Sequence, residues 1–474
     1  MLHVVVADGV GVVAGEQFGP GGVALGGVVE LGETQSAPGQ PVEVGGFDFP
    51  AIAEWIACGF FLGDKNFTKK EFRQEADFNC EPSWFYEPRD ITFKSAVEEF
   101  THIFENLILT NVKNKRIILP LSGGLDSRTI ASALRNRDNI VTYSYEFLGG
   151  VKETKYARRI SKEMSWPFNN YLIPKGYLWD RIELLAEINL CQSDFIHPRQ
   201  MAVIDQISKL GDLIISGQWG DVLFDLPKLS AKENLDNQTR FLFHKIVKPG
   251  GLFLSKKLWE EWGFTGKFEK ILFNRIKELL LEIKIENPSR RVQAFKSIHW
   301  AQRWANPNLN IFSSNCELFA PYYENAVCEF ICSIPNNYLR DRKIQIKYIQ
   351  NSSPSLAKIP WQIFDLNLYN YKYFNNFFFP RRVYRFLMRN FNEKILNNPL
   401  TIQRNWELQF LGSENRKHLE YWLFEKKRIN DIVPSDLINN FYDKFTNENQ
   451  VIYSHPISML LTLSLWCEKF WKRK

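Results

Sequence analysis

The sequence predicts an α/β fold: a doubly wound parallel sheet joined to a mainly helical C-terminal part. Two observations support this fold class. Between residues 116 and 215, short apolar runs alternate with segments of helical periodicity, a pattern typical of parallel sheets with crossover helices. From about residue 233 onward, the pattern becomes mainly helical and aromatic, through Trp300, Trp304, Trp361 and the final stretch 457–471.

The individual elements follow from local signals. Residues 49–61 predict a short helix, because Pro50 is tolerated in a first turn. Residues 90–110 carry apolar side chains at helical spacing and predict an amphipathic helix. In the alternating region, strands are expected at 116–121, 139–147 and 212–215, and helices at 128–137, 153–164 and 201–210.

Composition divides the chain. The first 46 residues hold twelve of its 27 glycines and no Lys, Arg or Asn. They are either a poorly ordered extension that buries no core or not native coding sequence, and we favour the second interpretation. The predicted divisions are an extension at 1–46, a remnant of another domain with a linker at 47–89, an α/β domain at 90–365 and a helical region at 366–474.

Charge and cysteine usage exclude several classes of protein. The net charge of +6 is too mild for a nucleic-acid-binding signature, and no apolar run approaches the roughly 20 residues of a membrane span. Seven cysteines without a CxxC pair argue against a disulfide framework or a zinc site. The aromatic and basic run 377–387 is interpreted as core with a solvated edge. We expect a cytoplasmic protein without nucleic-acid partners.

The most informative motif is Ser122-Gly123-Gly124-Leu125-Asp126-Ser127, placed between a predicted strand and a predicted helix. Two glycines allow the backbone to approach an anion, and the helix N-terminus and serine hydroxyls add donors. Asp126 would repel a phosphate, so its presence suggests a bridging Mg²⁺. The alternative is an ordinary tight turn, in which Gly, Ser and Asp are all common.

These residues resemble the PP-loop of ATP-pyrophosphatases, and three later segments resemble the asparagine synthetases within that group. Residues 214–224, with Ser216-Gly217-Gln218-Trp219-Gly220-Asp221, resemble the family's Ser-Gly-x-Gly-x-Asp-Glu signature. Glu317 followed by residues 321–324 resembles its Glu-x-Arg-x-Pro-Phe-Leu-Asp stretch, and residues 347–349 resemble its lysine segment. The resemblance covers about residues 47–361.

The resemblance implies roles for individual residues. Asp126 and Asp221 would share Mg²⁺, and Lys347 would neutralise the departing pyrophosphate; by themselves, Asp221 would be a turn or cap residue and Lys347 a solvated lysine. Leu121, Tyr143 and Ser144 would line the adenine pocket. The residues implied to bind the ATP phosphates are Ser122, Gly123, Gly124, Asp126, Ser127, Gly217 and Gln218.

The chain also departs from the family. Gln218 and Val222 replace acidic residues of the second signature, so a base role at Gln218 is lost, and Trp219 replaces a small residue of the acceptor pocket. The family's N-terminal glutaminase begins with a cysteine nucleophile, whereas Leu2 follows Met1 here. Residues 49–67 resemble only that domain's closing segment.

The resemblance therefore implies an ATP-dependent amide-forming enzyme. It would adenylate aspartate or a related small-molecule carboxylate, release pyrophosphate and let ammonia or an amine attack, with nitrogen supplied free or by a separate glutaminase. The alternatives are a PP-loop tRNA-modifying enzyme, which would carry a basic or thiol-bearing RNA module, and a non-catalytic ATP-binding scaffold.

Overall fold

The computed structural model describes residues 46–69, 83–150, 154–313, 315–373, 402 and 404–471, and the backbone of two short N-terminal strands. These strands, β1 (Val5–Val6) and β2 (Val13–Ala14), pair antiparallel. The expectations for the rest of residues 1–45 and for the run 377–387 lie outside the described residues.

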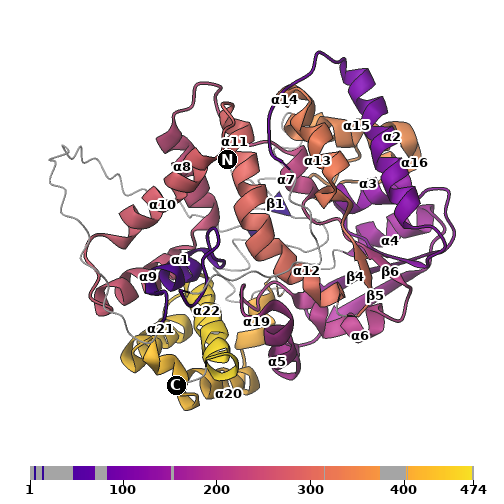
Figure 1. Cartoon of the computed structure of the whole chain (residues 1–474). Helices are drawn as coiled ribbons and strands as arrows, with labels where there is room; N and C mark the ends of the chain where they lie inside the picture. Colours follow the sequence, from indigo (N-terminus) through magenta and orange to yellow (C-terminus); the bar gives the residue numbers. More distant parts are fainter. Residues whose placement is uncertain are drawn as a thin grey trace.

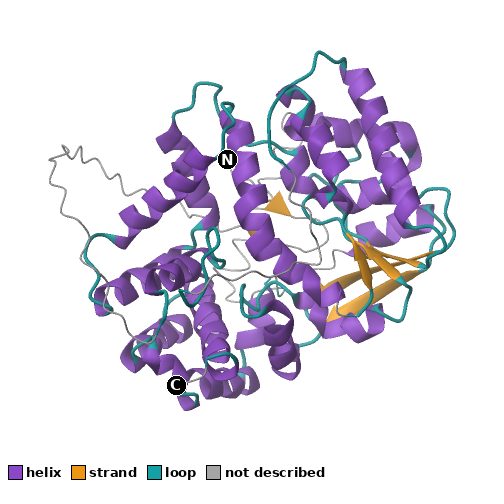
Figure 2. Ribbon diagram, viewed as in Figure 1, coloured by secondary structure: helices purple, strands orange, loops and turns teal. Residues whose placement is uncertain are grey.

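A five-stranded sheet, parallel throughout, forms the α/β part of the molecule (Figure 2). Its order is β5-β4-β3-β6-β7, so the chain starts in the middle, moves outward to one edge and then returns to build the other. The strands are β3 (Ile117–Pro120), β4 (Ile140–Phe147), β5 (Phe168–Ile173), β6 (Leu213–Ile215) and β7 (Glu317–Phe319). This order confirms the predicted doubly wound sheet.

Helices cover both faces of this sheet. One face carries α2, α3, α4, α13, α15 and α16, and the other carries α5, η1, α6 and α12 (Figure 1). Their bounds are α2 (Phe93–Asn111), α3 (Asp126–Ala133), α4 (Thr154–Glu163), α5 (Tyr177–Asn189), η1 (Arg199–Val203), α6 (Ile204–Ile207), α12 (Asn306–Ser313), α13 (Asn325–Cys332), α15 (Lys343–Ser352) and α16 (Pro354–Lys358). Short turns connect them at α7 (Gly220–Phe224), η3 (Pro321–Tyr323), α14 (Asn336–Leu339), η4 (Arg340–Arg342) and η5 (Tyr371–Tyr373).

The sequence patterns located many elements of this region but missed others, among them helix α5. The helix expected at 201–210 is a 3-10 helix, η1, followed by the four-residue α6. Strand β5 was not predicted, because Asn169 and Asn170 interrupt its apolar pattern and Asn is depleted in strands. Strand β7 has only three residues, too few for a periodicity to appear.

The remaining helices form the mainly helical part of the molecule, at the left of Figure 1. Helix α1 (Phe49–Cys58) packs against α9 and α9 against α22, so the segment after residue 46 joins the C-terminal helices. The other members are α8 (Leu235–Ile246), α9 (Pro249–Glu261), α10 (Phe268–Glu282), α11 (Pro288–Phe295), η2 (Lys296–Ala305), α19 (Asn405–Phe410), α20 (Ser413–Glu420), η6 (Tyr421–Glu425), η7 (Arg428–Asp431), α21 (Ser435–Asn447) and α22 (Gln450–Lys469).

A single continuous hydrophobic core runs from α1 through the sheet to α22. The segments on either side of the predicted boundaries at residues 47, 90 and 366 therefore share one core. Their assignment as separate domains stays a prediction. None of the helices in the described part of the chain combines the length and apolarity that a bilayer crossing requires.

Candidate functional site

Two glycine-containing turns meet at the carboxyl ends of the central strands. The motif turn follows β3, the Ser216–Gly217–Gln218 turn follows β6, and the two strands pair in parallel. The strand order reverses between β3 and β6, which is where ligands bind in open α/β sheets. The fold thus brings together two motifs that lie about 90 residues apart in the sequence.

Serine hydroxyls close both turns in the same way. Ser122 Oγ accepts the Gly124 N–H at 3.1 Å, and Ser216 Oγ accepts the Gln218 N–H at 3.2 Å. Ser127, in the first turn of α3, accepts the Ser122 N–H at 3.2 Å and lies 3.1 Å from the Ser122 hydroxyl. These bonds hold the first turn in a fixed curve with its serine hydroxyls facing each other.

Gly123 makes room for protein atoms as well as for a ligand. A Cβ at this position would lie 2.7 Å from Gln362 Oε1 and 2.9 Å from Tyr156 Cβ. The Gln362 N–H also donates to the Gly123 carbonyl at 3.1 Å. The segment after α16 therefore lies directly on the motif turn, and glycine is required at residue 123 by this close approach.

The side chain of Arg128 holds the motif turn in place through hydrogen bonds to backbone carbonyls. Its side chain is fully buried in α3 and donates to the carbonyls of Ile359 at 2.8 Å, Pro360 at 3.0 Å and Gly123 at 3.3 Å. The planar guanidinium can bridge several carbonyls in fixed directions, which a lysine cannot do. Arg128 thus ties the motif turn to the segment that covers it.

Asp126 is the point at which all four motif segments meet. Its buried carboxylate accepts from Gln345 Nε2 at 2.8 Å and pairs with Arg342 Nη2 at 3.3 Å. Its backbone carbonyl accepts the Tyr322 hydroxyl at 2.8 Å. From the second turn, Gly220 presses against the same carboxylate, because a Cβ there would lie 2.3 Å from Asp126 Oδ1.

We expect Gly220→Ala to disable this centre. The Asp126 carboxylate is fixed by Gln345 and Arg342 and cannot give way, so the added methyl should destabilise the fold by about 1–3 kcal/mol and displace the carboxylate. Urea unfolding and ATP–pyrophosphate exchange measure the two effects. Gly211→Ala is the matched control: its Cβ would meet the Arg116 carbonyl at 2.6 Å, at the other end of β6. Exchange retained in folded Gly220→Ala protein would contradict this geometry.

The predicted adenine-pocket residues lie around the ends of β3 and β4. Leu121 continues the ladder, with its N–H donating to the Tyr143 carbonyl at 2.8 Å, and its side chain is buried. The Tyr143 hydroxyl donates to Gln200, and burial raises its pKa well above the usual range. The Tyr143 ring is fully buried, whereas Ser144 is half-buried at the same edge.

Lys347 makes none of the contacts described at Asp126, and its role at the pyrophosphate stays a prediction. It is exposed on α15, two residues beyond Gln345, or about 200° of helical rotation from the side chain that contacts Asp126. The cation at Asp126 is Arg342, which precedes α15 and adopts a left-handed backbone conformation with φ of 56°. The spacing of the motif identified the correct segment but did not predict which residues of its helix contact Asp126.

Asp221 and Gln218 belong to the second turn and the start of α7, after the carboxyl end of β6. Asp221 is half-buried, and its carboxylate makes no hydrogen bond or ion pair with the described residues. Gln218 is buried, and neither of its amide atoms has an ordinary hydrogen-bond partner among the described residues. Its side chain lies near Tyr323 and lowers the pKa of that hydroxyl. Burial nevertheless raises the Tyr323 pKa well above its usual range.

An aromatic wall begins at Trp219 and consists of Trp219, Tyr323, Trp300 and Trp304. Trp219 adopts a left-handed backbone conformation with φ of 77°, unusual for a bulky side chain and easy for the glycine of the family pattern. Its Nε1–H donates to Ser297 Oγ at 3.2 Å, and its ring lies 6.3 Å from Trp300 and 6.1 Å from Tyr323. Such local strain is typical of functional sites.

Lys296, which begins the π-helix η2 beside this wall, lies in no motif of the sequence. Its ammonium lies 5.9 Å from the centre of the Trp300 ring and forms no ion pair among the described residues. Burial and the nearby Lys245 lower the Lys296 pKa to about 8, against the opposing effect of Asp221 and Asp225. A lysine enclosed in this way, with no direct counter-ion, is suited to bind an anionic ligand.

The residues fit a Mg²⁺ site completed by the nucleotide. In the described part of the chain, no three His, Cys, Asp or Glu side chains gather closely enough to hold an ion alone. Mg²⁺ commonly takes one or two carboxylates plus substrate phosphates and water. Asp126 and Asp221 supply one carboxylate each, one in the motif turn and one after the second turn, which is the number that such a site needs.

Comparison with known proteins agrees with this arrangement. A family model described as asparagine synthase matches residues 112–349, which is half of the 474-residue chain. The matched range contains both turns, Asp126, Asp221, Lys296 and the N-terminal part of α15. A search of curated proteins gave no match.

Proposed function

The chain belongs to the asparagine synthase family, whose members use ATP, and from this premise we propose that it adenylates a small-molecule carboxylate and converts it to an amide. A synthetase-type, ATP-dependent amide-forming function follows from the family. The identity of the carboxylate, the release of AMP and pyrophosphate, and the attack by ammonia or an amine belong to the proposal.

The observation that carries the proposal is the convergence at Asp126. Four segments separated by up to 219 residues meet at one buried aspartate: Gln345 and Arg342 contact its carboxylate, Gly220 of the second turn lies against that carboxylate, and Tyr322 donates to its backbone carbonyl. A buried aspartate with this many partners is unusual in an ordinary turn between a strand and a helix. It suits a site that must position phosphates and a cation.

Each group then has a defined task. The two turns would cradle the ATP phosphates, and Leu121 and Ser144 would border the adenine. Asp126 and Asp221 would hold Mg²⁺, which when bound supplies charge neutralisation to the phosphates. Arg342 is the buried cation near enough to stabilise charge on the departing pyrophosphate once the Asp126 carboxylate has another partner.

The acceptor would bind beyond the second turn, against the aromatic wall. Trp219, Trp300 and Tyr323 supply flat apolar surfaces, and Lys296 supplies a cation at one end. With Trp219 where the family pattern has a small residue, the acceptor site would favour a carboxylate with an apolar or planar portion over aspartate. Lys296 would bind a negatively charged group of that acceptor.

We expect Lys296→Met to weaken binding of the acceptor. Hydrogen bonds to charged groups contribute about 1.5–3 kcal/mol, so the apparent KM for the carboxylate should rise roughly 10- to 150-fold. Met retains the apolar stem against Trp300, and Lys347→Met, on the exposed side of α15, is the control. A rise in the KM for ATP instead would assign Lys296 to the phosphates, and unchanged constants would remove it from the site.

The proposed function is tested by pyrophosphate release from Mg²⁺-ATP with a panel of carboxylates, aspartate first, in the presence of ammonium. Release that depends on one carboxylate, and on ammonium for multiple turnovers, is the expected result. ATP binding without release for any carboxylate would favour the non-catalytic scaffold. The engagement of Asp126 by Arg342 and Gln345 is the observation that keeps this second candidate in view.

A further inference from the structure

Amide formation needs a base that the second turn does not supply. An attacking amine must lose a proton as its nitrogen bonds to the acyl carbon, and Gln218 has no proton-accepting group at neutral pH. Burial keeps the Tyr323 hydroxyl protonated by raising its pKa. Asp221 would be occupied by the metal. The base must therefore come from elsewhere along the carboxyl edge of the sheet.

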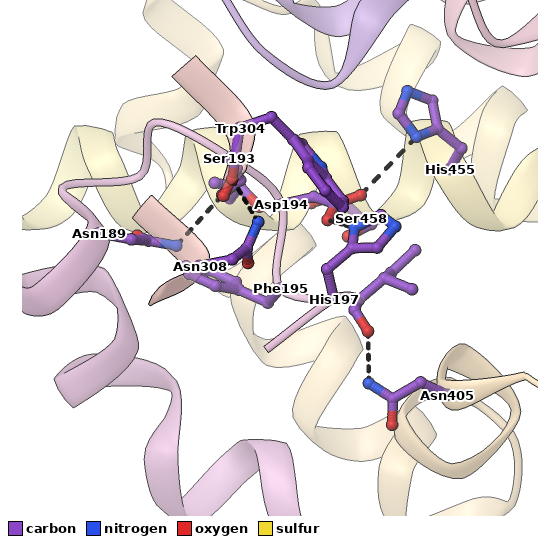
Figure 3. Close-up of polar contacts among 12 residues, drawn as sticks. Asn189, Ser193, Asp194, Phe195, His197, Trp304, Asn308, Asn405, His455 and Ser458 are labelled. Atoms are coloured by element: carbon purple, nitrogen blue, oxygen red, sulfur yellow. Dashed lines mark hydrogen bonds and ion pairs between the residues drawn. The ribbon is translucent and has the colours of Figure 1, made fainter. Parts of the chain in front are cut away.

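The loop between α5 and η1 holds a histidine and a carboxylate in the required relation (Figure 3). His197 Nδ1 lies 2.7 Å from Asp194 Oδ1, and the Asp194 side chain is only 2% exposed. The carboxylate can only accept, so Nδ1 carries the proton and Nε2 carries the lone pair. His197 Nε2 makes no hydrogen bond with any residue that the structure describes.

Asp194 is held as a charged orienting group. Its burial alone would raise the pKa, but the interaction with His197, together with His455 and the Ile196 N–H, lowers it below the usual range. His455 lies 3.8 Å away, and its Nε2 is 3.0 Å from the Ile56 carbonyl. Burial lowers the His455 pKa to about 4, so this second imidazole stays neutral and is tied to α1.

His197 is the accessible tip of a buried loop. Among residues 191–201, only Ile196 and His197 are not buried, and the His197 side chain is 18% exposed. On one side, the Gln200 side chain accepts from Tyr143 of β4, and the Arg199 guanidinium lies 5.5 Å from the centre of the Phe147 ring at the carboxyl end of that strand. The loop therefore borders the edge of the sheet at which the two turns lie.

On the other side, the aromatic wall reaches His197 directly. Its imidazole lies edge-on to Trp304 at 4.8 Å, Trp304 lies 6.0 Å from Trp300, and Trp300 lies 6.3 Å from Trp219. Lys296, Trp300 and Trp304 recur at every fourth residue of η2, so one face of the π-helix runs from the second turn to His197. An acceptor bound along this face would have Lys296 at one end and the imidazole at the other.

We propose that His197, oriented by Asp194, is the general base of amide formation. As the amine nitrogen bonds to the acyl carbon, the bond between that carbon and the AMP oxygen breaks and AMP leaves with the electron pair. The nitrogen's proton passes to His197 Nε2 and then to solvent. His197 is thus a catalytic residue, Asp194 is a positioning residue, and the inference rests on the function proposed above.

The charged groups around His197 are compatible with its role as the general base. Asp194 lies on its own loop, neutral His455 comes from α22, and Trp304 of η2 is uncharged. The competing base is Lys296, but phosphate or carboxylate bound beside it would favour its charged form. Lys296 is therefore a cation when substrates are bound, and a cation cannot accept the proton.

The test separates the two half-reactions. ATP–pyrophosphate exchange reports adenylation, which needs no amine, and amide formation reports both steps. We expect His197→Gln to leave exchange within about twofold of the unsubstituted enzyme and to lower amide formation roughly 10²- to 10³-fold, the usual contribution of a general base. Asp194→Asn should act in the same direction, because its amide no longer fixes the required tautomer. His455→Asn is the matched control, since it meets the same carboxylate from the other side.

The pH dependence gives a second measurement that needs no variant. Amide formation by the unsubstituted enzyme should fall toward acid pH, where a general base becomes protonated, whereas exchange should not. Added imidazole should restore part of the lost rate in His197→Gly. Equal losses in exchange and amide formation, an unchanged rate in folded His197→Gln, or a limb near pH 8 that Lys296→Met abolishes would each overturn the inference. Absence of exchange in the unsubstituted enzyme would overturn the proposed function itself.

Discussion

Asp221→Asn is expected to lower ATP–pyrophosphate exchange roughly 10²- to 10³-fold while leaving the melting temperature unchanged. The Asp221 carboxylate is half-buried at the second turn and has no partner among the described residues, so asparagine fits without loss of a structural contact. It removes one of the two charges that would hold Mg²⁺ against the phosphates. Exchange rates at several Mg²⁺ concentrations measure the effect, which extra Mg²⁺ should partly reverse.

Asp225→Asn is the control for this experiment. Asp225 ends the same short helix one turn later and is exposed. Its substitution removes the same charge from nearly the same region, so general electrostatic effects would appear in both variants. Exchange that survives in Asp221→Asn but falls in Asp225→Asn would show that the metal and phosphates lie elsewhere.

Arg128→Met should destabilise the protein by about 3–5 kcal/mol, the usual consequence of removing one partner from a buried charged network. The substitution leaves the carbonyls of Gly123, Ile359 and Pro360 without their donor in a fully buried position. Urea unfolding gives the free energy, and nucleotide titration of the folded fraction should show weaker ATP binding, because the motif turn loses its support.

Arg135→Met offers a comparison within the same part of the chain. Arg135 follows α3 and pairs with Glu105 at a partly exposed position, where ion pairs contribute about 0–1 kcal/mol. Arg128→Lys should restore little, because an ammonium cannot reach three carbonyls in separate directions. A loss below about 1 kcal/mol in Arg128→Met would mean that the turn does not depend on this arginine.

The sequence was sufficient to predict the sheet and the convergence of its turns. Strand–turn–helix order at Ser122–Ser127 and a second strand ending at Ser216 predict neighbouring carboxyl ends, because parallel strands place them on one edge. Strands β5 and β7 escaped prediction because both are edge strands with little apolar periodicity: β5 carries Asn169 and Asn170, and β7 has three residues.

The individual site residues were harder to predict than the segments. Lys347 matches a family lysine by spacing, but the rotation of α15 directs Gln345 to Asp126 and leaves Lys347 exposed. Lys296 and His197 belong to no motif. Asp194 is close to His197 in the sequence, but the position of each residue beside the site depends on neighbours more than 70 residues away, Asp221 for the lysine and Trp304 for the histidine. Such contacts are set by tertiary packing, which no local pattern records.

The most direct test of the central claim is the identity of the nucleotide product. Purified protein is incubated with Mg²⁺-ATP, ammonium and the carboxylate panel, and the nucleotides are separated and quantified together with pyrophosphate. We predict AMP and pyrophosphate in equal amounts, formed only with an accepted carboxylate and lost in Asp221→Asn. ADP and inorganic phosphate, or nucleotide bound without turnover for every carboxylate, would contradict an adenylating synthetase built around Asp126.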